Sequence, residues 1–116
     1  MMDFDVSIEE HAEAYSVIAV RGEVDLHTAP KVQYAIERAA ANESAAAAVV
    51  VVDMSSITFI DSTALSMLAR AKRSLDEQSI SFRIAEPSSP VERIFSVTGF
   101  RDYFDIFESR EEAVAR

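Results

Sequence analysis

The chain has 116 residues, of which 49% are hydrophobic, so it is long and apolar enough to bury the core of one domain. It has a net charge of −9 and no cysteine, which excludes disulfides and thiolate metal sites and argues against nucleic-acid binding, because that function needs a basic surface. The N-terminus lacks the basic and apolar regions of a signal peptide, and the longest apolar run, residues 45–52, is too short to span a bilayer. We therefore expect one cytoplasmic domain over residues 1–116, whose acidic surface favours partners with basic patches.

Two strands and a helix are predicted in the first third of the chain. Residues 3–8 and 15–20 have strand patterns, and Gly22 is expected to end the second strand. Thr28 is expected to cap the following helix, with Pro30 in the first turn, where its missing N–H costs little. Helical spacing predicts a buried stripe made of Val32, Ile36 and Ala39.

The middle of the chain predicts a central strand, a short loop and an amphipathic helix. Residues 49–53 are continuously apolar up to Asp53, which is typical of a strand buried on both faces. The helix is expected to start at Ser62, and residues 79–85 then alternate as a further strand. The predicted buried side of this helix consists of Leu65, Leu68 and Leu75.

The last third of the chain contains three termination and capping signals. The stretch SPVE, residues 89–92, is typical of a capping box with proline at the first helical position. Gly99 is expected to end that helix, residues 103–107 to form a short strand, and Ser109 to cap a short final helix.

This order of elements predicts an α/β fold with a mixed, mostly parallel sheet and four helices, in which the first strand is antiparallel. In such sheets, functional groups gather beyond the carboxyl ends of the strands. Three acids are expected at those ends: Asp25, Asp53 and Asp61.

Ser62 has two interpretations. In the first, its hydroxyl or the Asp61 carboxylate simply caps the helix, an interaction worth about 1 kcal/mol. In the second, Ser62 is a phosphate acceptor, because a phosphoserine there would face free N–H groups and the positive end of the helix dipole. The phosphate would add about −1.5 to −2 charges, so a partner docked over this loop would be repelled while the fold stayed intact.

Other chemistry at these positions finds less support in the residues. A serine hydrolase needs a base, but the histidines are His11 and His27 and no G-x-S-x-G motif is present. The three aspartates could hold a hard cation, but their spacing matches no binding loop, and no metal is expected. A receiver domain would place a phosphoacceptor aspartate at Asp53, but it also needs a lysine after its fifth strand, and no lysine follows Lys72.

One face of the helix after Ser62 could meet a partner. Thr63, Met67 and Arg70 lie at helical spacing opposite the leucines. Such a face is often merely solvated, but an exposed methionine adapts to irregular partners and so also suits a protein-binding surface.

Three stretches make the chain resemble the STAS-domain anti-sigma factor antagonists of bacteria. They are residues 22–29 (GEVDLHTA), residues 52–63 (VDMSSITFIDST) and residues 89–100 (SPVERIFSVTGF). The resemblance implies that Ser62 is phosphorylated by an anti-sigma factor kinase, which the unphosphorylated chain binds and so releases the sigma factor. It also implies that a serine phosphatase resets the switch, that Asp25 and Asp61 contribute to the contact surface, and that the chain itself is neither an enzyme nor dependent on a cofactor.

The chain departs from the family pattern Asp-Ser-Ser/Thr-Gly-Leu-Gly at two positions. Ala64 and Ser66 replace the glycines, which stiffens the start of the helix and is expected to place a methyl group where a partner would approach. The resemblance also implies an alternative function, because other STAS domains serve in transporters and stressosome-like complexes. In it the chain is a STAS subunit that is never phosphorylated and docks on such a complex through the same surface.

Overall fold

The computed structural model describes residues 3–11, 15–41 and 49–115. It contains five strands, β1 to β5, four α-helices, α1 to α4, and one short 3₁₀ helix. In chain order they are β1 (Asp5–His11), β2 (Tyr15–Val24), α1 (Ala29–Ala40), β3 (Val49–Ile60), α2 (Ser62–Glu77), β4 (Ser81–Ala85), α3 (Ser89–Thr98), the 3₁₀ helix (Phe100–Asp102), β5 (Asp105–Phe107) and α4 (Arg110–Val114).

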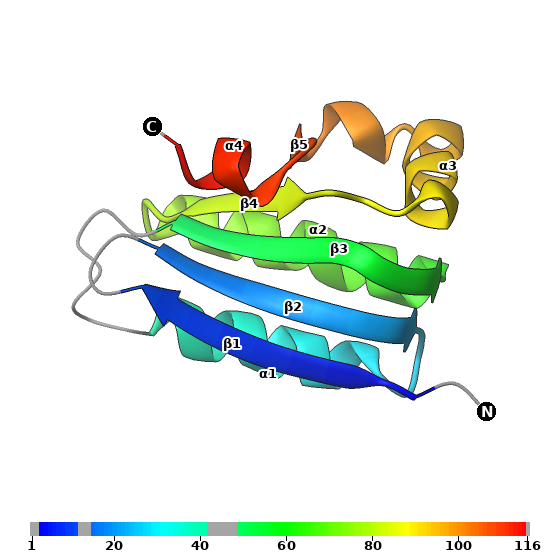
Figure 1. Cartoon of the computed structure of the whole chain (residues 1–116), viewed down its shortest axis with the longest axis horizontal. Helices are drawn as coiled ribbons and strands as arrows, with labels where there is room; N and C mark the ends of the chain where they lie inside the picture. Colours follow the sequence, from blue (N-terminus) through cyan, green and yellow to red (C-terminus); the bar gives the residue numbers. More distant parts are fainter. Residues whose placement is uncertain (1–2, 12–14, 42–48, 116) are drawn as a thin grey trace.

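The five strands form one sheet in the order β1-β2-β3-β4-β5. The β1–β2 pair is antiparallel and the other three pairs are parallel. Helices α1 and α2 run along one face of the sheet, while α3 lies at one end of the molecule and α4 near the other (Figure 1). The predicted α/β class, the mixed and mostly parallel sheet, the antiparallel first strand and the four helices are all confirmed.

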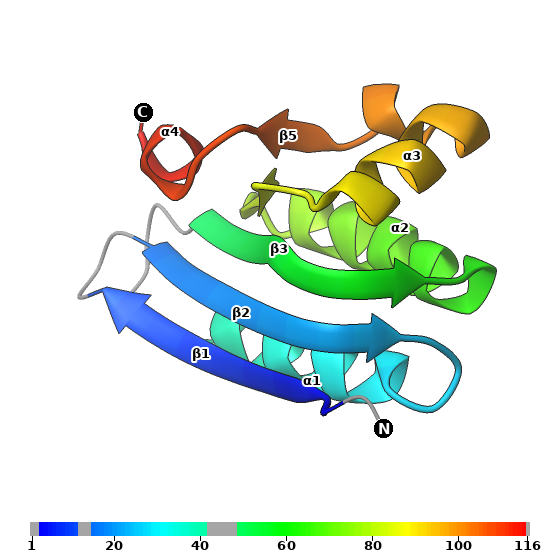
Figure 2. The same cartoon turned by 45° about the vertical axis from the view of Figure 1, so that its right-hand side comes forward.

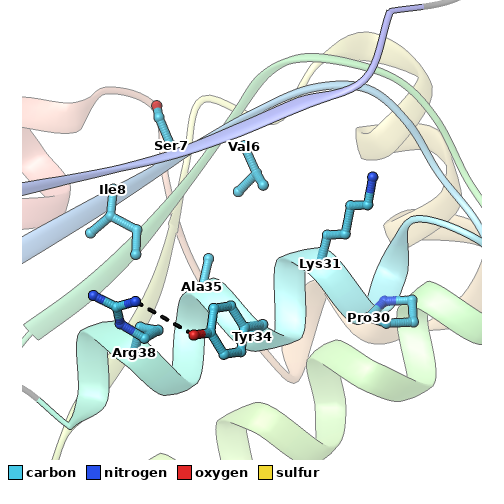
Figure 3. A pocket seen from close by; sticks show the side chains of 8 residues that line it. All are labelled: Val6, Ser7, Ile8, Pro30, Lys31, Tyr34, Ala35 and Arg38. Carbon is cyan, nitrogen blue, oxygen red and sulfur yellow. Dashed lines mark hydrogen bonds between the residues drawn. The ribbon is translucent and has the colours of Figure 1, made fainter.

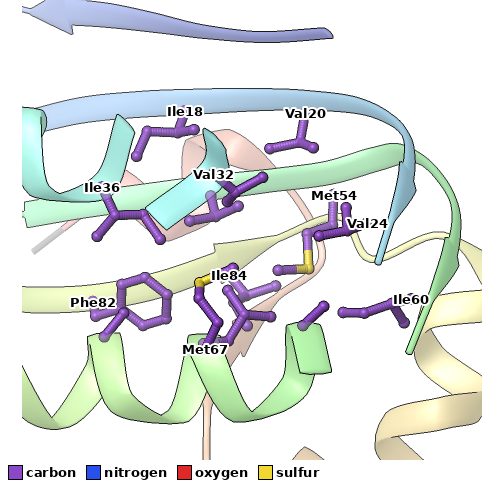
Figure 4. Packing of buried hydrophobic residues seen from close by; sticks show 14 of the residues in the cluster. Ile18, Val20, Val24, Val32, Ile36, Met54, Ile60, Met67, Phe82 and Ile84 are labelled. Atoms are coloured by element: carbon purple, nitrogen blue, oxygen red, sulfur yellow. The ribbon is translucent and has the colours of Figure 1, made fainter. Parts of the chain in front are cut away.

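The main core lies between the sheet and the pair α1 and α2 (Figure 4). Strands β2, β3 and β4 contribute Ile18, Val52 and Ile84, while the stripe predicted for α1 is buried as expected. A second, smaller cluster lies on the opposite face, where Ala113 of α4 packs on Val17 and Val51. Because successive residues of β3 point to opposite faces, Val51 and Val52 can serve both clusters, as the continuous apolar run predicts.

Strand β3 is longer than predicted, and this length positions the candidate site. Only Val49–Asp53 pairs with β4, whereas β2 stays paired with β3 as far as Ile60. On its other side the extension is held by Ser88, whose N–H donates to the Met54 carbonyl (3.2 Å) and whose hydroxyl donates to the Ile57 carbonyl (2.6 Å). The prediction of a loop over residues 54–60 is therefore wrong. These residues lack the alternation of apolar and polar side chains that is typical of a strand, but β2 and Ser88 supply hydrogen-bond partners for their backbone.

Some of the predicted ends of helices and strands are confirmed and others are wrong. Gly99 ends α3 with a φ of 84°, and the Ser109 hydroxyl caps α4 by accepting from the Glu112 N–H, so both predictions are confirmed. The capping box at Ser89 is wrong: Ser88 is the N-cap of α3, and its hydroxyl is committed to β3 instead. Gly22 does not end β2, which continues to Val24, but its φ of 104° and the Asp3 carbonyl, 2.7 Å from where a Cβ would lie, require a glycine there.

Within the residues that the structure describes, no helix is long and apolar enough to cross a membrane.

Candidate functional site

The sheet brings Asp25 and Asp61 together, as predicted. Strands β2 and β3 are paired as far as Val24 and Ile60, so the two aspartates follow neighbouring strand ends, and the Asp61 N–H donates to the Val24 carbonyl (3.2 Å). The start of α1, the start of α2 and the first turns of α3 lie at this same end of the molecule (Figure 2). A surface built from three separate chain segments is the kind of place where a binding partner can be recognised.

Asp61, rather than Ser62, caps α2. Its backbone is extended, and its carboxylate accepts from the Ala64 N–H (2.9 Å) while its carbonyl accepts from the Leu65 N–H (3.0 Å). Ser62 is the first helical residue and is exposed, and its hydroxyl has no hydrogen-bond partner within the described part of the chain. Because Asp61 fulfils the capping role, the Ser62 hydroxyl is left available at the positive end of the helix dipole.

Asp25 is held by its own loop. The Asp25 carboxylate accepts from the N–H groups of His27 (2.9 Å) and Thr28 (3.1 Å), and the Thr28 hydroxyl donates to the Glu23 carbonyl (2.7 Å). Local desolvation opposes ionisation of Asp25, but these N–H donors outweigh it and hold the pKa of the carboxyl below its ordinary value. Asp25 therefore presents a fixed negative charge beside Asp61. Thr28 is the N-cap residue of α1 as predicted, although its side chain does not bond the first turn.

Asp53 lies apart from the other two aspartates. It is paired with Ala85 at the end of β4, well before the end of β3, and its residue is only 7% exposed. Its carboxylate accepts from the Arg110 Nε (2.7 Å), and the same guanidinium donates to Glu9 (3.0 Å). Burial opposes ionisation of Asp53, but the Ser55 N–H and the Arg110 guanidinium hold its pKa below the ordinary value. Asp53 thus fastens α4 to the sheet.

The three aspartates do not assemble a metal site. Across residues 3–11, 15–41 and 49–115, no three histidine, aspartate or glutamate side chains gather closely enough to hold an ion. His11, the last residue of β1, stacks on Tyr15, the first residue of β2, with their ring centres 4.5 Å apart. No hydrogen bond joins either described histidine to Ser62.

The predicted outer face of α2 needs one correction. Thr63 and Arg70 are exposed, but Met67 is only 2% exposed and belongs to the main core, so the prediction of an exposed Met67 is wrong. The reason is that α2 packs against α1 as well as against the sheet, which widens its apolar stripe beyond the three leucines. Ala64 is fully buried too, so its methyl group points into the core and not toward a partner. Of the two replaced glycines, only Ser66 is exposed.

Two exposed hydrophobic side chains at this end were missed by the sequence reasoning. Leu26, in the loop after Asp25, is 64% exposed, and Phe59, near the end of β3, is 48% exposed. A hollow of about 310 Å³ adjoins Phe59. It is lined by Phe59, Ile60, Ser89, Pro90, Arg93 and Ile94. The available signal was the adjacent pair Phe59 and Ile60, because neighbouring strand residues point to opposite faces and both cannot be buried in one core.

The site therefore combines an unengaged hydroxyl, fixed negative charge and exposed apolar surface. It offers a modifiable group beside a surface suited to a protein partner, and the described residues supply Ser62 with no hydrogen-bonded base for catalysis. The expectation that three aspartates lie at the carboxyl ends of the strands is confirmed for Asp25 and Asp61 and is wrong for Asp53. Ser62 follows Asp61 directly, as the first residue of α2.

Comparisons with known proteins agree with this architecture. The family model described as "STAS domain" matches residues 5–113. The anti-sigma-B factor antagonist of Listeria monocytogenes is 30% identical over 90% of both chains. The crystal structure of an anti-sigma factor antagonist from Mycobacterium paratuberculosis is 26% identical, with a TM-score of 0.80 over 96% of this chain and 91% of that one.

The same fold is found in SpoIIAA of Bacillus, which has been solved in two forms. The unphosphorylated form is 21% identical with a TM-score of 0.76 over 95% of this chain and 93% of that one. The phosphorylated form is 19% identical with a TM-score of 0.70 over 95% and 96%. At these identities the likeness concerns the fold alone. The family match across nearly all of the described sheet and helices, together with the Listeria relative, establishes that this chain belongs to the STAS domain family.

Proposed function

We propose that the chain is an anti-sigma factor antagonist that binds an anti-sigma factor kinase and is released from it when Ser62 is phosphorylated. The observation that carries the proposal is the Ser62 side chain: it is exposed, unengaged within the described residues, and placed directly after the Asp61 cap at the start of α2. The similarity to proteins named anti-sigma factor antagonists supports the same role. The kinase supplies ATP, this chain performs no catalysis, and a serine phosphatase removes the phosphate.

The fold can accept the modification without unfolding. A phosphate on Ser62 would extend into solvent, close to the free N–H groups of the first turn of α2, where the helix dipole favours negative charge. The Asp61 carboxylate already bonds the Ala64 N–H, so the cap does not depend on the Ser62 hydroxyl. Helix α2 therefore stays folded, while the surface around Ser62 gains a charge of about −1.5 to −2.

The same negative charge would weaken the binding of a docked partner. Ser62 lies beside Asp25 and Asp61, so a partner that covers this surface already accommodates two carboxylates. A phosphate buried in that contact would lose its hydration and add repulsion toward any acidic group on the partner. We assign Leu26 and Phe59 as the apolar anchors of the contact, with Thr63 and Arg70 on the adjoining face of α2.

The test is to measure kinase binding and phosphorylation with matched variants. Candidate anti-sigma kinases and ATP should add the mass of one phosphate to the wild-type chain and none to Ser62→Ala. Ser62→Asp should bind the kinase at least about fivefold more weakly than Ser62→Ala, within the usual range of regulatory coupling. Ser74→Ala, which removes an exposed hydroxyl near the other end of α2, is the control and should be phosphorylated like the wild type. Equal binding by Ser62→Ala and Ser62→Asp would contradict the proposal.

A second candidate function rests on the replacement of the family glycines by Ala64 and Ser66. Ser66 is exposed where the family pattern has a glycine, so it adds a side chain to the surface that a kinase would contact, whereas Ala64 is buried and adds none. In that case the chain is a constitutive STAS subunit of a transporter or a stressosome-like complex. No phosphate gain with any cognate kinase, combined with tight binding of wild-type protein to such a complex, would favour this alternative.

A further inference from the structure

A groove runs along the outer edge of the sheet, away from Ser62. It lies between β1 and α1 and has a volume of about 580 Å³. Val6 and Ile8 point into it from β1, and Ala35 and Tyr34 line it from α1 (Figure 3). Tyr34 is 60% exposed although its ring is largely apolar. The groove therefore keeps an apolar surface in contact with water beside a strand edge.

The strand beside this groove has an open edge. Among the described strands, β1 is paired with β2 only, so the N–H and C=O groups along its outer side have no strand partner. An unpaired edge over a hydrophobic groove can add another strand, whose alternate side chains would enter the groove.

Charge marks the two ends of the groove. Lys31 and Arg38, two helical turns apart on α1, line it in a chain that is otherwise strongly acidic. The Lys31 ammonium lies 5.8 Å from the centre of the Phe4 ring, and Arg38 lies over Tyr34. No ion pair joins either cation to a carboxylate among the described residues. An entering strand with a carboxylate at one end would therefore be complementary to the groove.

We propose that the occupant is a second copy of this chain, paired antiparallel through β1 about a twofold axis at Ile8. In this arrangement Val6 faces Glu10 of the second copy. Phe4, Val6 and Ile8 pack toward α1, so by alternation Glu10 shares that face. The carboxylate of Glu10 of the second copy then lies at the Lys31 end of the groove, and symmetry creates the same contact twice.

The charges along β1 favour this register over the two in which the axis lies one residue away. With the axis at Ile8, Asp5 faces His11 and Ser7 faces Glu9 of the second copy. Shifting the axis to Ser7 would place Asp5 opposite Glu9, and shifting it to Glu9 would place two Glu9 side chains opposite each other. Like charges directly across a strand pair are destabilising, and a one-residue slip between the two strands would turn the apolar side chains out of the groove.

The test is a charge swap followed by sedimentation analysis of the full chain. Wild-type protein should form a concentration-dependent dimer. Lys31→Glu and Glu10→Lys should each raise the dimer dissociation constant by at least about tenfold, because each sets like charges together at two symmetric contacts. The double variant Lys31→Glu/Glu10→Lys should restore the dimer. Arg73→Glu, on the exposed side of α2, is the control of equal charge change and should leave dimerisation unaltered.

Two outcomes would overturn the pairing. One is a monomer at every concentration, which would leave the groove to a strand of another protein. The other is a folded double variant, verified by circular dichroism, that dimerises no better than the single variants. Because β1 is separated from β3 and Ser62 by β2, this test does not depend on phosphorylation, and either proposal can fail without the other.

Discussion

Asp53 and Asp61 lie on and just after the same strand, yet the molecule uses them in opposite ways. Asp53 is buried where β4 ends and is bonded by Arg110, so its charge is fully committed to holding α4. Asp61 follows the extension of β3, its carboxylate bonds the first turn of α2, and an exposed serine lies beside it. Both residues are aspartates, so their different roles follow from whether β4 lies beside them and not from the residue type. Asp53, at the end of β4, stabilises the fold, whereas Asp61, beyond β4, contributes to an exposed surface.

The largest effect is expected from removing the buried member of this comparison. Asp53→Ala should lower the free energy of unfolding by about 2–3 kcal/mol, because it strips a charged partner from Arg110 and leaves the Ser55 N–H without its acceptor. Urea denaturation measures the change. Asp76→Ala, which removes an exposed i,i+4 partner of Lys72, is the control and should cost about 0.5 kcal/mol or less. An equal decrease in the free energy of unfolding for both variants would contradict the distinction between the buried, ion-paired Asp53 and an exposed aspartate.

The pH dependence of stability should carry the same signature. The pKa of Asp53 in the folded chain lies below its ordinary value of about 3.9. The unfolded state therefore binds the proton first as the pH falls, and the contribution of Asp53 is complete at neutral pH and is lost on acidification through the folded pKa. The difference in unfolding free energy between the wild type and Asp53→Asn should shrink below about pH 4. A difference that grows on acidification would contradict the ion pair.

The smallest effects belong to the exposed end. Asp61→Ala should cost about 1 kcal/mol, the usual contribution of an N-cap, because only the bond to the Ala64 N–H is lost. Ser62→Ala should change stability by about 0.5 kcal/mol or less, as expected for an exposed side chain without a partner. Thermal unfolding of both variants provides the measurement. If Ser62→Ala were the more damaging of the two, Ser62 and not Asp61 would be the functional cap.

The sequence predicted those parts of the fold that depend on local patterns. The helical stripe of α1, the left-handed Gly99 and the Ser109 cap each arise from residues only a few positions apart, and each is confirmed. The extension of β3 was missed because its support comes from β2 and from Ser88, 31 residues after Ile57.

Long-range contacts also explain the errors at the candidate site. The partner of Asp53 is Arg110, 57 residues away, and no local pattern identifies such a pair. Met67 was placed on the outer face because the width of the apolar stripe depends on α1 packing beside α2. The prediction is correct for Asp25 and Asp61 because parallel strands that end together bring the residues after them to one edge.

The extension of β3 beyond β4 also has a kinetic consequence. A phosphate on Ser62, just beyond the end of β3, would lie outside the packed layers. Adding or removing it would therefore require neither opening of the sheet nor unfolding of the chain. The lifetime of the phosphorylated state would then be set by the kinase and the phosphatase. One molecule could pass through many such cycles while its core stays folded.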